Sequence, residues 1–210
     1  MTACPFVPWP AGEVLVLASR SPRRAELLRT AGIPFEARPV GDVEAEHADR
    51  LARLHDHPAP YAEELARLKA AAACELLPGR LVLGADTIVV VDDEVLEKPR
   101  DDAEARAMLA RLSGRRHVVI SAIALCGGPY RHWVGHERTE VEFLALERSA
   151  IERYVATGEP MDKAGAYGIQ GLGALMVRGV RGCYFNVMGL PLARLGEALR
   201  AILAPEESAS

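Results

Sequence analysis

Residues 80–99, RLVLGADTIVVVDDEVLEKP, decide the fold of this chain. Its long apolar run predicts a buried strand, and Asp92-Asp93 predicts a turn into a second, shorter strand. Asp86 interrupts the first strand with a carboxylate. Burying an ionised carboxylate is costly unless a cation, a metal ion or several hydrogen-bond donors compensate it. In the alternative, Asp86 and Thr87 lie at a strand end and bond local backbone.

The rest of the chain alternates strand-like runs with helical periodicity, which is typical of an α/β protein. The helices are expected at residues 22–31, 61–77, 101–114, 149–158 and 191–203. The other strands are expected at residues 14–18, 35–40, 117–126 and 139–146, with a last strand or hairpin in 174–189 and a polar loop after residue 40. Several strands follow one another without a helix, so we expect a mixed sheet with a ligand cleft between two lobes.

The composition excludes several classes of protein. Hydrophobic residues make up 50% of the 210 residues and charged residues 26%, which excludes a disordered chain. A net charge of -4 gives no overall attraction to nucleic acid or to an anionic membrane, so we expect neither as a partner. No apolar run reaches about 18 residues and no signal sequence is recognisable, which predicts a cytoplasmic protein.

The four cysteines, Cys4, Cys74, Cys126 and Cys183, are widely separated. They form no C-x-x-C pair and have no flanking metal-ligand spacing. We therefore expect neither a zinc site nor a disulfide framework, and predict reduced thiols that lie mostly in the core.

The sequence SRSPRR at residues 19–24 places cations where a helix already carries positive charge. Ser21 suits an N-cap and Pro22 the first helical position, so Arg23 and Arg24 fall in the first turn. Each charge costs roughly 0.3 to 1 kcal/mol there, whereas a bound phosphate would make the same arrangement favourable. The alternative is that both arginines point into solvent or pair with nearby acids.

Three lysines could join these arginines around Asp86. Lys69 lies beside the apolar stripe of its helix, Lys98 ends the second strand, and Lys163 lies in a loop of small residues. Taken singly, each could instead be a surface lysine whose stem packs on apolar side chains. The standard phosphate-binding loops are absent, so an anion would have to be held by separate segments.

Four motifs together resemble one known family. SRSPRRAELL, LGADTIV, EKP and DKAGAYGIQG, in this order and at these separations, resemble the Maf family of nucleoside triphosphate pyrophosphatases, over nearly the whole chain. The resemblance implies an α/β fold with a mixed sheet in two lobes and a deep central cleft, like that of inosine triphosphate pyrophosphatases. It also implies a single catalytic domain at residues 14–203, preceded by an N-terminal extension at 1–13. The tail at 204–210, APEESAS, is expected to be disordered.

The function implied by the resemblance is hydrolysis of dTTP and UTP, between the α and β phosphates, to monophosphate and pyrophosphate. A Mg²⁺ or Mn²⁺ ion and a homodimer are implied as well, and modified pyrimidine nucleotides are further candidate substrates. By resemblance Asp86 is the proton acceptor that activates water, and Arg23, Thr87 and Gln170 select the base. The other motif positions expected to line the cleft are Ser19, Arg24, Lys69, Lys98, Asp162 and Lys163.

The metal carboxylates are less well defined by the motifs. Asp86 could be a metal ligand as well as a base, and one carboxylate can do either. A second carboxylate is expected after the second strand, where Glu44 is our assignment and Glu46 the alternative. Two other functions remain open at this point: a nucleotide-binding regulator of septum formation without turnover, and a phosphatase that removes terminal phosphates.

Overall fold

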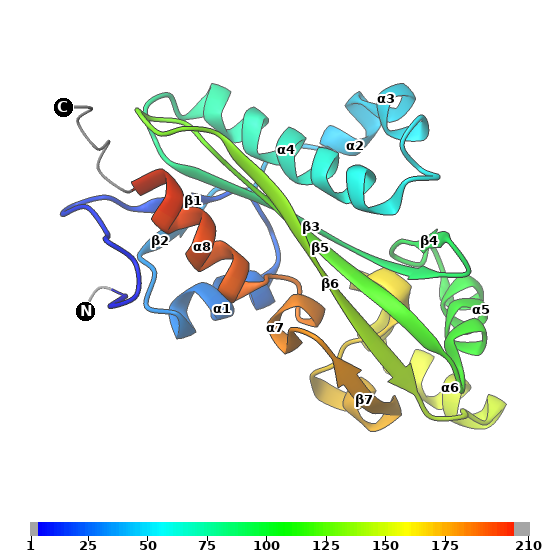
Figure 1. Ribbon diagram of the computed structural model, residues 1–210. Coiled ribbons are helices and arrows are strands. Elements are labelled where there is room, and N and C mark those ends of the chain that lie inside the picture. The colour runs from blue at the N-terminus through cyan, green and yellow to red at the C-terminus, as the bar shows by residue number, and fades with distance from the viewer. Residues whose placement is uncertain (1–3, 204–210) are drawn as a thin grey trace.

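The computed structural model describes residues 4–203, and the predicted tail at 204–210 lies outside them (Figure 1). Its centre is a seven-stranded sheet in the order β2-β1-β3-β5-β6-β7, with β4 paired to β3. β1 is parallel to β2 and β3, and the other pairs are antiparallel, which confirms the predicted mixed sheet. The strands are β1 Leu15–Leu17, β2 Phe35–Ala37, β3 Val82–Val91, β4 Glu94–Leu96, β5 Arg116–Cys126, β6 Trp133–Phe143 and β7 Val177–Arg181.

Helices cover the sheet and fill its ends. The α-helices are α1 Pro22–Thr30, α2 Val43–Glu46, α3 Ala48–Ala52, α4 Pro58–Leu76, α5 Asp102–Leu112, α6 Arg148–Val155, α7 Tyr184–Val187 and α8 Leu192–Leu203. The 3-10 helices are η1 Glu159–Asp162, η2 Ala164–Ala166 and η3 Gly171–Met176. None of the helices between residues 4 and 203 combines the length and the apolar character needed to cross a membrane.

The stretch quoted first folds as predicted. β3 and β4 form an antiparallel hairpin, and both turn residues have positive φ, 52° for Asp92 and 60° for Asp93. Aspartate tolerates this left-handed conformation better than most residues, and two such residues match the twist of a tight hairpin. β3 then pairs along most of its length with β5, which places Thr87 opposite Ser121.

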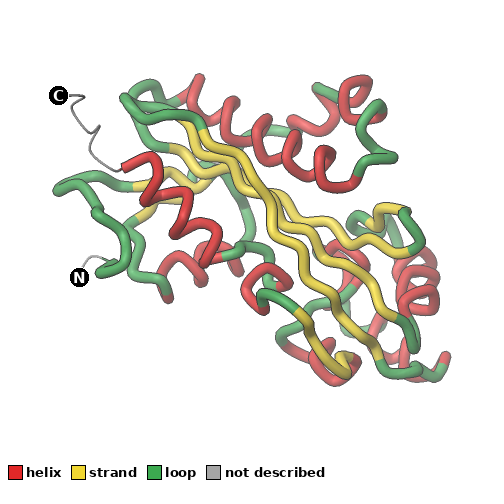
Figure 2. Tube along the Cα trace, in the orientation of Figure 1, coloured by secondary structure: helices red, strands yellow, loops and turns green. Residues whose placement is uncertain are grey.

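Two lobes share the long strands, as predicted (Figures 1 and 2). At one end α1 and α8 pack on β1 and β3 around residues such as Leu17, Leu83 and Leu195, all fully buried. At the other end α5, α6 and the 3-10 helices pack around Leu109 and Phe143. Strands β3, β5 and β6 run through both lobes (Figure 2).

Helix α4 lies very close to β3 near Asp86. A Cβ atom at Gly84 would lie 2.2 Å from the backbone oxygen of Ala66, so only glycine allows this approach. The contact brings the middle of α4 against the polar part of β3. Lys69, one turn further along α4, thereby reaches Asp86.

Some local predictions were wrong. The loop after residue 40 contains the short helices α2 and α3. Of the two alternatives for residues 174–189, the single last strand is confirmed as β7 and the hairpin is wrong, because the helix α7 follows. Helix α6 begins at Arg148 with Glu147 as its N-cap residue, so the expected helix start at Ser149 is one residue late. The described part of the N-terminal extension packs on the core, where Cys4 and Val7 are buried.

The prediction of reduced cysteines was wrong for two of the four. Cys74 at the end of α4 and Cys126 at the end of β5 form a disulfide, while Cys4 and Cys183 are free. The partners are 52 residues apart in sequence, and only the packing of α4 along the sheet brings them together. No local pattern in the sequence marks this pair.

Candidate active site

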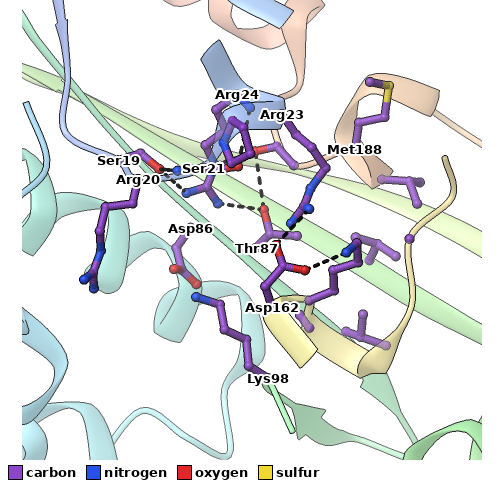
Figure 3. A pocket seen from close by; sticks show the side chains of 18 of the residues that line it. Ser19, Arg20, Ser21, Arg23, Arg24, Asp86, Thr87, Lys98, Asp162 and Met188 are labelled. Carbon is purple, nitrogen blue, oxygen red and sulfur yellow. Dashed lines mark hydrogen bonds and ion pairs between the residues drawn. The ribbon is translucent and has the colours of Figure 1, made fainter. Parts of the chain in front are cut away.

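A cavity of about 570 Å³ opens between the two lobes. Residues from the loop after β1 and from α1 line one side, the segment from η1 to Gly171 lines the other, and β3 contributes Asp86 and Thr87 between them (Figure 3). All the site residues predicted from the sequence line this cavity. They are Ser19, Arg23, Arg24, Glu44, Lys69, Asp86, Thr87, Lys98, Asp162, Lys163 and Gln170.

The N-terminus of α1 presents Arg24 to the cavity. Ser21 caps the helix, with its hydroxyl 3.4 Å from the backbone nitrogen of Arg24, and Pro22 follows as the first helical residue. The Arg24 guanidinium donates three hydrogen bonds, to Ser19 Oγ at 3.0 Å, Thr87 Oγ1 at 3.1 Å and the Gly189 carbonyl at 2.9 Å. Burial lowers the pKa of Arg24, although arginine stays protonated in proteins. The guanidinium is therefore a fixed positive charge at the junction of the two lobes.

Arg23 reaches across the cavity to the opposite lobe. Its Nη1 atom lies 3.2 Å from Asp162 Oδ2, and the other Asp162 oxygen lies 2.5 Å from Lys163 Nζ (Figure 3). Burial raises the pKa of the Asp162 carboxyl, but its bonds to Lys163 and Arg23 outweigh burial and lower it overall. Two cations thus converge on one carboxylate, and a phosphate entering the cavity could exchange with it.

Lys69 joins the two predicted metal carboxylates. Its Nζ atom lies 2.6 Å from Asp86 Oδ1 and 2.6 Å from Glu44 Oε1. Burial lowers the pKa of the Lys69 ammonium, but the negative charges of Asp86 and Glu44 outweigh burial and raise it overall. Glu46, the alternative to Glu44, does not line the cavity.

The side chains of Lys98 and Gln170 make no hydrogen bond or ion pair within the described part of the chain. Lys98 points toward Asp86 from the end of the β3–β4 hairpin (Figure 3), yet no hydrogen bond or ion pair joins its ammonium to another residue among 4–203. The Gln170 side chain likewise has no hydrogen-bond partner among these residues. Both side chains can therefore bind a ligand without breaking an existing bond.

Glu159 is a cavity residue that sequence reasoning missed. Its carboxylate accepts hydrogen bonds from the backbone nitrogens of Leu172 and Gly173, both at 3.1 Å, and from the Tyr154 hydroxyl at 3.0 Å. Burial raises the pKa of this carboxyl, but the three donors outweigh burial and lower it overall. Glu159 thereby holds the loop that carries Gln170. Its partners lie up to 14 residues away, and no motif signals them.

A buried histidine on the sheet contacts the same loop, and sequence reasoning missed this residue as well. His117 Nε2 lies 2.8 Å from the hydroxyl of Tyr167, which lines the cavity, and both side chains are buried. Burial lowers the pKa of His117 to about 4, so the ring is neutral near pH 7. This pair fixes the middle of the DKAGAYGIQG segment against the sheet.

Comparison with known proteins shows the family of this chain. A family model described as "Maf-like protein" matches residues 14–202. The chain belongs to the Maf family. The family resemblance seen in the four motifs is thereby confirmed.

Similar curated Maf proteins carry one name. The protein of Symbiobacterium thermophilum is 55% identical over 88% of this chain and 92% of its own length, and is named dTTP/UTP pyrophosphatase. The protein of Moorella thermoacetica is 51% identical over 88% of this chain and 93% of its own length, and has the same name. Among solved structures, the Ham1 protein of Staphylococcus aureus is 17% identical, covers 77% of this chain and 78% of its own, and has a TM-score of 0.45.

The donor set of the Maf cavity fits a divalent cation. The Glu44 and Asp86 oxygens already converge on one positive group, the Lys69 ammonium. Mg²⁺ is usually held by one or two carboxylates together with substrate phosphates. Among residues 4–203 no cluster of three or more His, Cys, Asp or Glu side chains provides a closed metal cage, so substrate oxygens would complete the coordination.

Proposed function

We propose that this Maf protein hydrolyses dTTP and UTP to the nucleoside monophosphate and pyrophosphate. The observation that carries the proposal is a half-buried carboxylate, Asp86, surrounded by cations inside one cavity. The basic side chains that line it within the described residues are Arg20, Arg23, Arg24, Lys69, Lys98 and Lys163. A triphosphate carries about four negative charges near neutral pH, and such a set of positioned cations suits it.

Asp86 orients and deprotonates the attacking water in this proposal. Lys69 Nζ donates a hydrogen bond to Asp86 Oδ1 at 2.6 Å and holds the carboxylate in place. A carboxylate within hydrogen-bond reach of water can accept its proton. Arg24 and Lys98 neutralise the charge that develops on the phosphate oxygens, since both present cations to the cavity that contains Asp86. A divalent cation held by Glu44 and Asp86 would add Lewis-acid stabilisation of phosphate charge.

Gln170 is proposed to recognise the base. Its amide offers an N–H donor and a carbonyl acceptor side by side, as the O4 oxygen and the N3–H group of uracil or thymine require. The side chain has no competing partner among the described residues, and Glu159 anchors the backbone that follows it. Arg23 and Thr87 line the same cavity and complete the proposed specificity set.

Replacing Gln170 with alanine tests this assignment. We expect Gln170→Ala to lower kcat/KM for dTTP and UTP by about 10- to 100-fold, because the base loses a paired donor and acceptor. Activity on ATP and GTP should change little, so the ratio of kcat/KM for dTTP and UTP to kcat/KM for the purine nucleotides should fall. Steady-state pyrophosphate release from each nucleotide measures the effect. An equal loss for all nucleotides would assign Gln170 to the phosphates instead.

Product analysis tests the reaction itself. The full chain is incubated with dTTP, UTP, CTP, ATP or GTP and either Mg²⁺ or Mn²⁺, and the products are separated by ion-exchange chromatography. We expect monophosphate and pyrophosphate from dTTP and UTP. Diphosphate and orthophosphate would mean a terminal phosphatase, and nucleotide binding without turnover would favour the regulator of septum formation. Omitting the metal tests the predicted cofactor, while the homodimer and the cytoplasmic location stay predictions.

A further inference from the structure

Thr87 is hydrogen-bonded to a buried polar network that has no role in the proposed mechanism. Thr87 is half-buried in the cavity, and its Oγ1 atom lies 2.8 Å from Oγ of Ser121, its cross-strand neighbour on β5. Ser121 and Asn186 are fully buried. Ser121 Oγ in turn lies 2.8 Å from the backbone oxygen of Asn186, in α7. A chain of oxygens thus leads from the cavity into the core.

The hydrogens in this chain can be placed by counting donors. A carbonyl oxygen can only accept, and two oxygens 2.8 Å apart repel each other unless a hydrogen lies between them. The Ser121 hydroxyl must therefore donate to the Asn186 carbonyl. Since its one hydrogen is then used, Ser121 accepts from Thr87, and the Thr87 hydrogen points away from the cavity.

The lone pairs of Thr87 are partly occupied as well. Arg24 Nη2 donates to Thr87 Oγ1 at 3.1 Å, which takes one of its two lone pairs. The Gly189 carbonyl is another acceptor near the Thr87 hydroxyl, but it lies 3.4 Å away and already accepts from Arg24 Nε. The closer Ser121 oxygen therefore takes the Thr87 hydrogen, and the second lone pair of Thr87, a cavity residue, has no donor among residues 4–203.

Asn186 fixes the far end of the network. Its side-chain oxygen accepts from the Ser121 backbone nitrogen at 3.1 Å, and its amide nitrogen donates to Val119 O and Thr139 Oγ1, both at 3.0 Å. These partners determine the orientation of the amide, because exchange of its oxygen and nitrogen would put donor against donor. The Asn186 backbone is thereby held opposite Ser121.

We propose that Ser121 and Asn186 are positioning residues that make Thr87 a hydrogen-bond acceptor only, and so select bases with an N–H group at ring position 3. This inference rests on the proposed pyrimidine specificity and deepens it. Uracil and thymine carry that N–H, and Thr87 supplies a second acceptor for it beside Gln170. Cytosine presents a ring nitrogen lone pair there, which the Thr87 lone pair repels.

The test compares kcat/KM for UTP and CTP in the wild-type protein and in Ser121→Ala. In the variant the acceptor at 2.8 Å is lost and only the Gly189 carbonyl at 3.4 Å remains inside the protein, so the Thr87 hydroxyl can rotate and donate to the cytosine ring nitrogen. We expect the ratio of kcat/KM for UTP to kcat/KM for CTP to fall about tenfold, mainly because kcat/KM for CTP rises. The Asn186 carbonyl keeps a donor, the Gly189 backbone nitrogen at 2.9 Å, so the substitution leaves no unpaired carbonyl.

Two further variants distinguish a positioning role of Ser121 from a general loss of stability or activity. Ser113→Ala makes the same change at a serine bonded to Leu146, away from the cavity, and should leave the ratio unchanged. In a Thr87→Val background, Ser121→Ala should no longer alter the ratio, because its effect passes through the Thr87 hydroxyl. An unchanged ratio in Ser121→Ala, or an effect that persists in Thr87→Val, would overturn the inference.

A measurement on the wild-type protein does not depend on the folding of any variant. In the triphosphate of 3-deazacytidine a C–H group replaces the ring nitrogen, which removes the repelled lone pair. We expect it to be hydrolysed with a kcat/KM several-fold higher than that of CTP, and an equal or lower value would overturn the inference. If UTP itself is not hydrolysed, the proposed function fails and the inference with it, whereas UTP hydrolysis without these differences rejects the inference alone.

Discussion

Asp86→Asn is expected to lower kcat for dTTP by about 10²- to 10⁴-fold, the range by which a positioned general base accelerates a reaction. The amide keeps the shape of the side chain but cannot accept a proton from water. Lys69 retains Glu44 as a partner, so the local structure should persist. Single-turnover pyrophosphate release, with the enzyme in saturating excess over dTTP and with saturating metal, measures the chemical step.

Asp93→Asn is the matched control for this substitution. Asp93 lies on the same hairpin, is exposed, and does not line the cavity. Asparagine also tolerates its positive φ. The control should keep wild-type turnover. If Asp86→Asn retained most of its activity while remaining folded, the proton would have to be accepted by another group and the assignment of Asp86 would be wrong.

Arg24→Lys is expected to lower kcat/KM for dTTP by about 10- to 100-fold although it conserves the charge. The Arg24 fork donates to three oxygens on three different segments, at Ser19, Thr87 and Gly189. A lysine ammonium cannot reproduce a planar fork, so some of these oxygens lose their donor. Steady-state kinetics with dTTP, beside a thermal unfolding measurement, separates lost catalysis from lost stability.

Arg29→Lys provides the control on the same helix. Arg29 lies in the last turn of α1, is exposed, and its guanidinium stacks over the Phe35 ring at 5.6 Å from the centroid. Its replacement should leave kcat/KM unchanged. Full activity in Arg24→Lys would mean that charge alone is needed at this position and that the fork has no role.

The sequence predicted those parts of the site that break a local rule. A carboxylate inside an apolar strand and two arginines at a helix start are each unfavourable alone, so Asp86 and Arg24 attract attention without a structure. The same reasoning placed the hairpin and the main helices. These features depend on residues close together in the sequence.

The missed parts depend on contacts between distant segments. Glu159, Ser121 and Asn186 look unremarkable in sequence, and their partners are up to 67 residues away. The Cys74–Cys126 disulfide was missed for the same reason. Short helices such as α2 were missed because four residues give too little periodicity to recognise.

The continuous strands that join the two lobes have a mechanical consequence. β3, β5 and β6 pass through both lobes without a break, so the lobes cannot swing about a flexible connection at this point. A change in the angle between the two lobes therefore requires bending or twisting of the hydrogen-bonded ribbon itself. Asp86 and Thr87 lie midway along β3, so bending of the ribbon would move these proposed site residues less than the residues at the two strand ends.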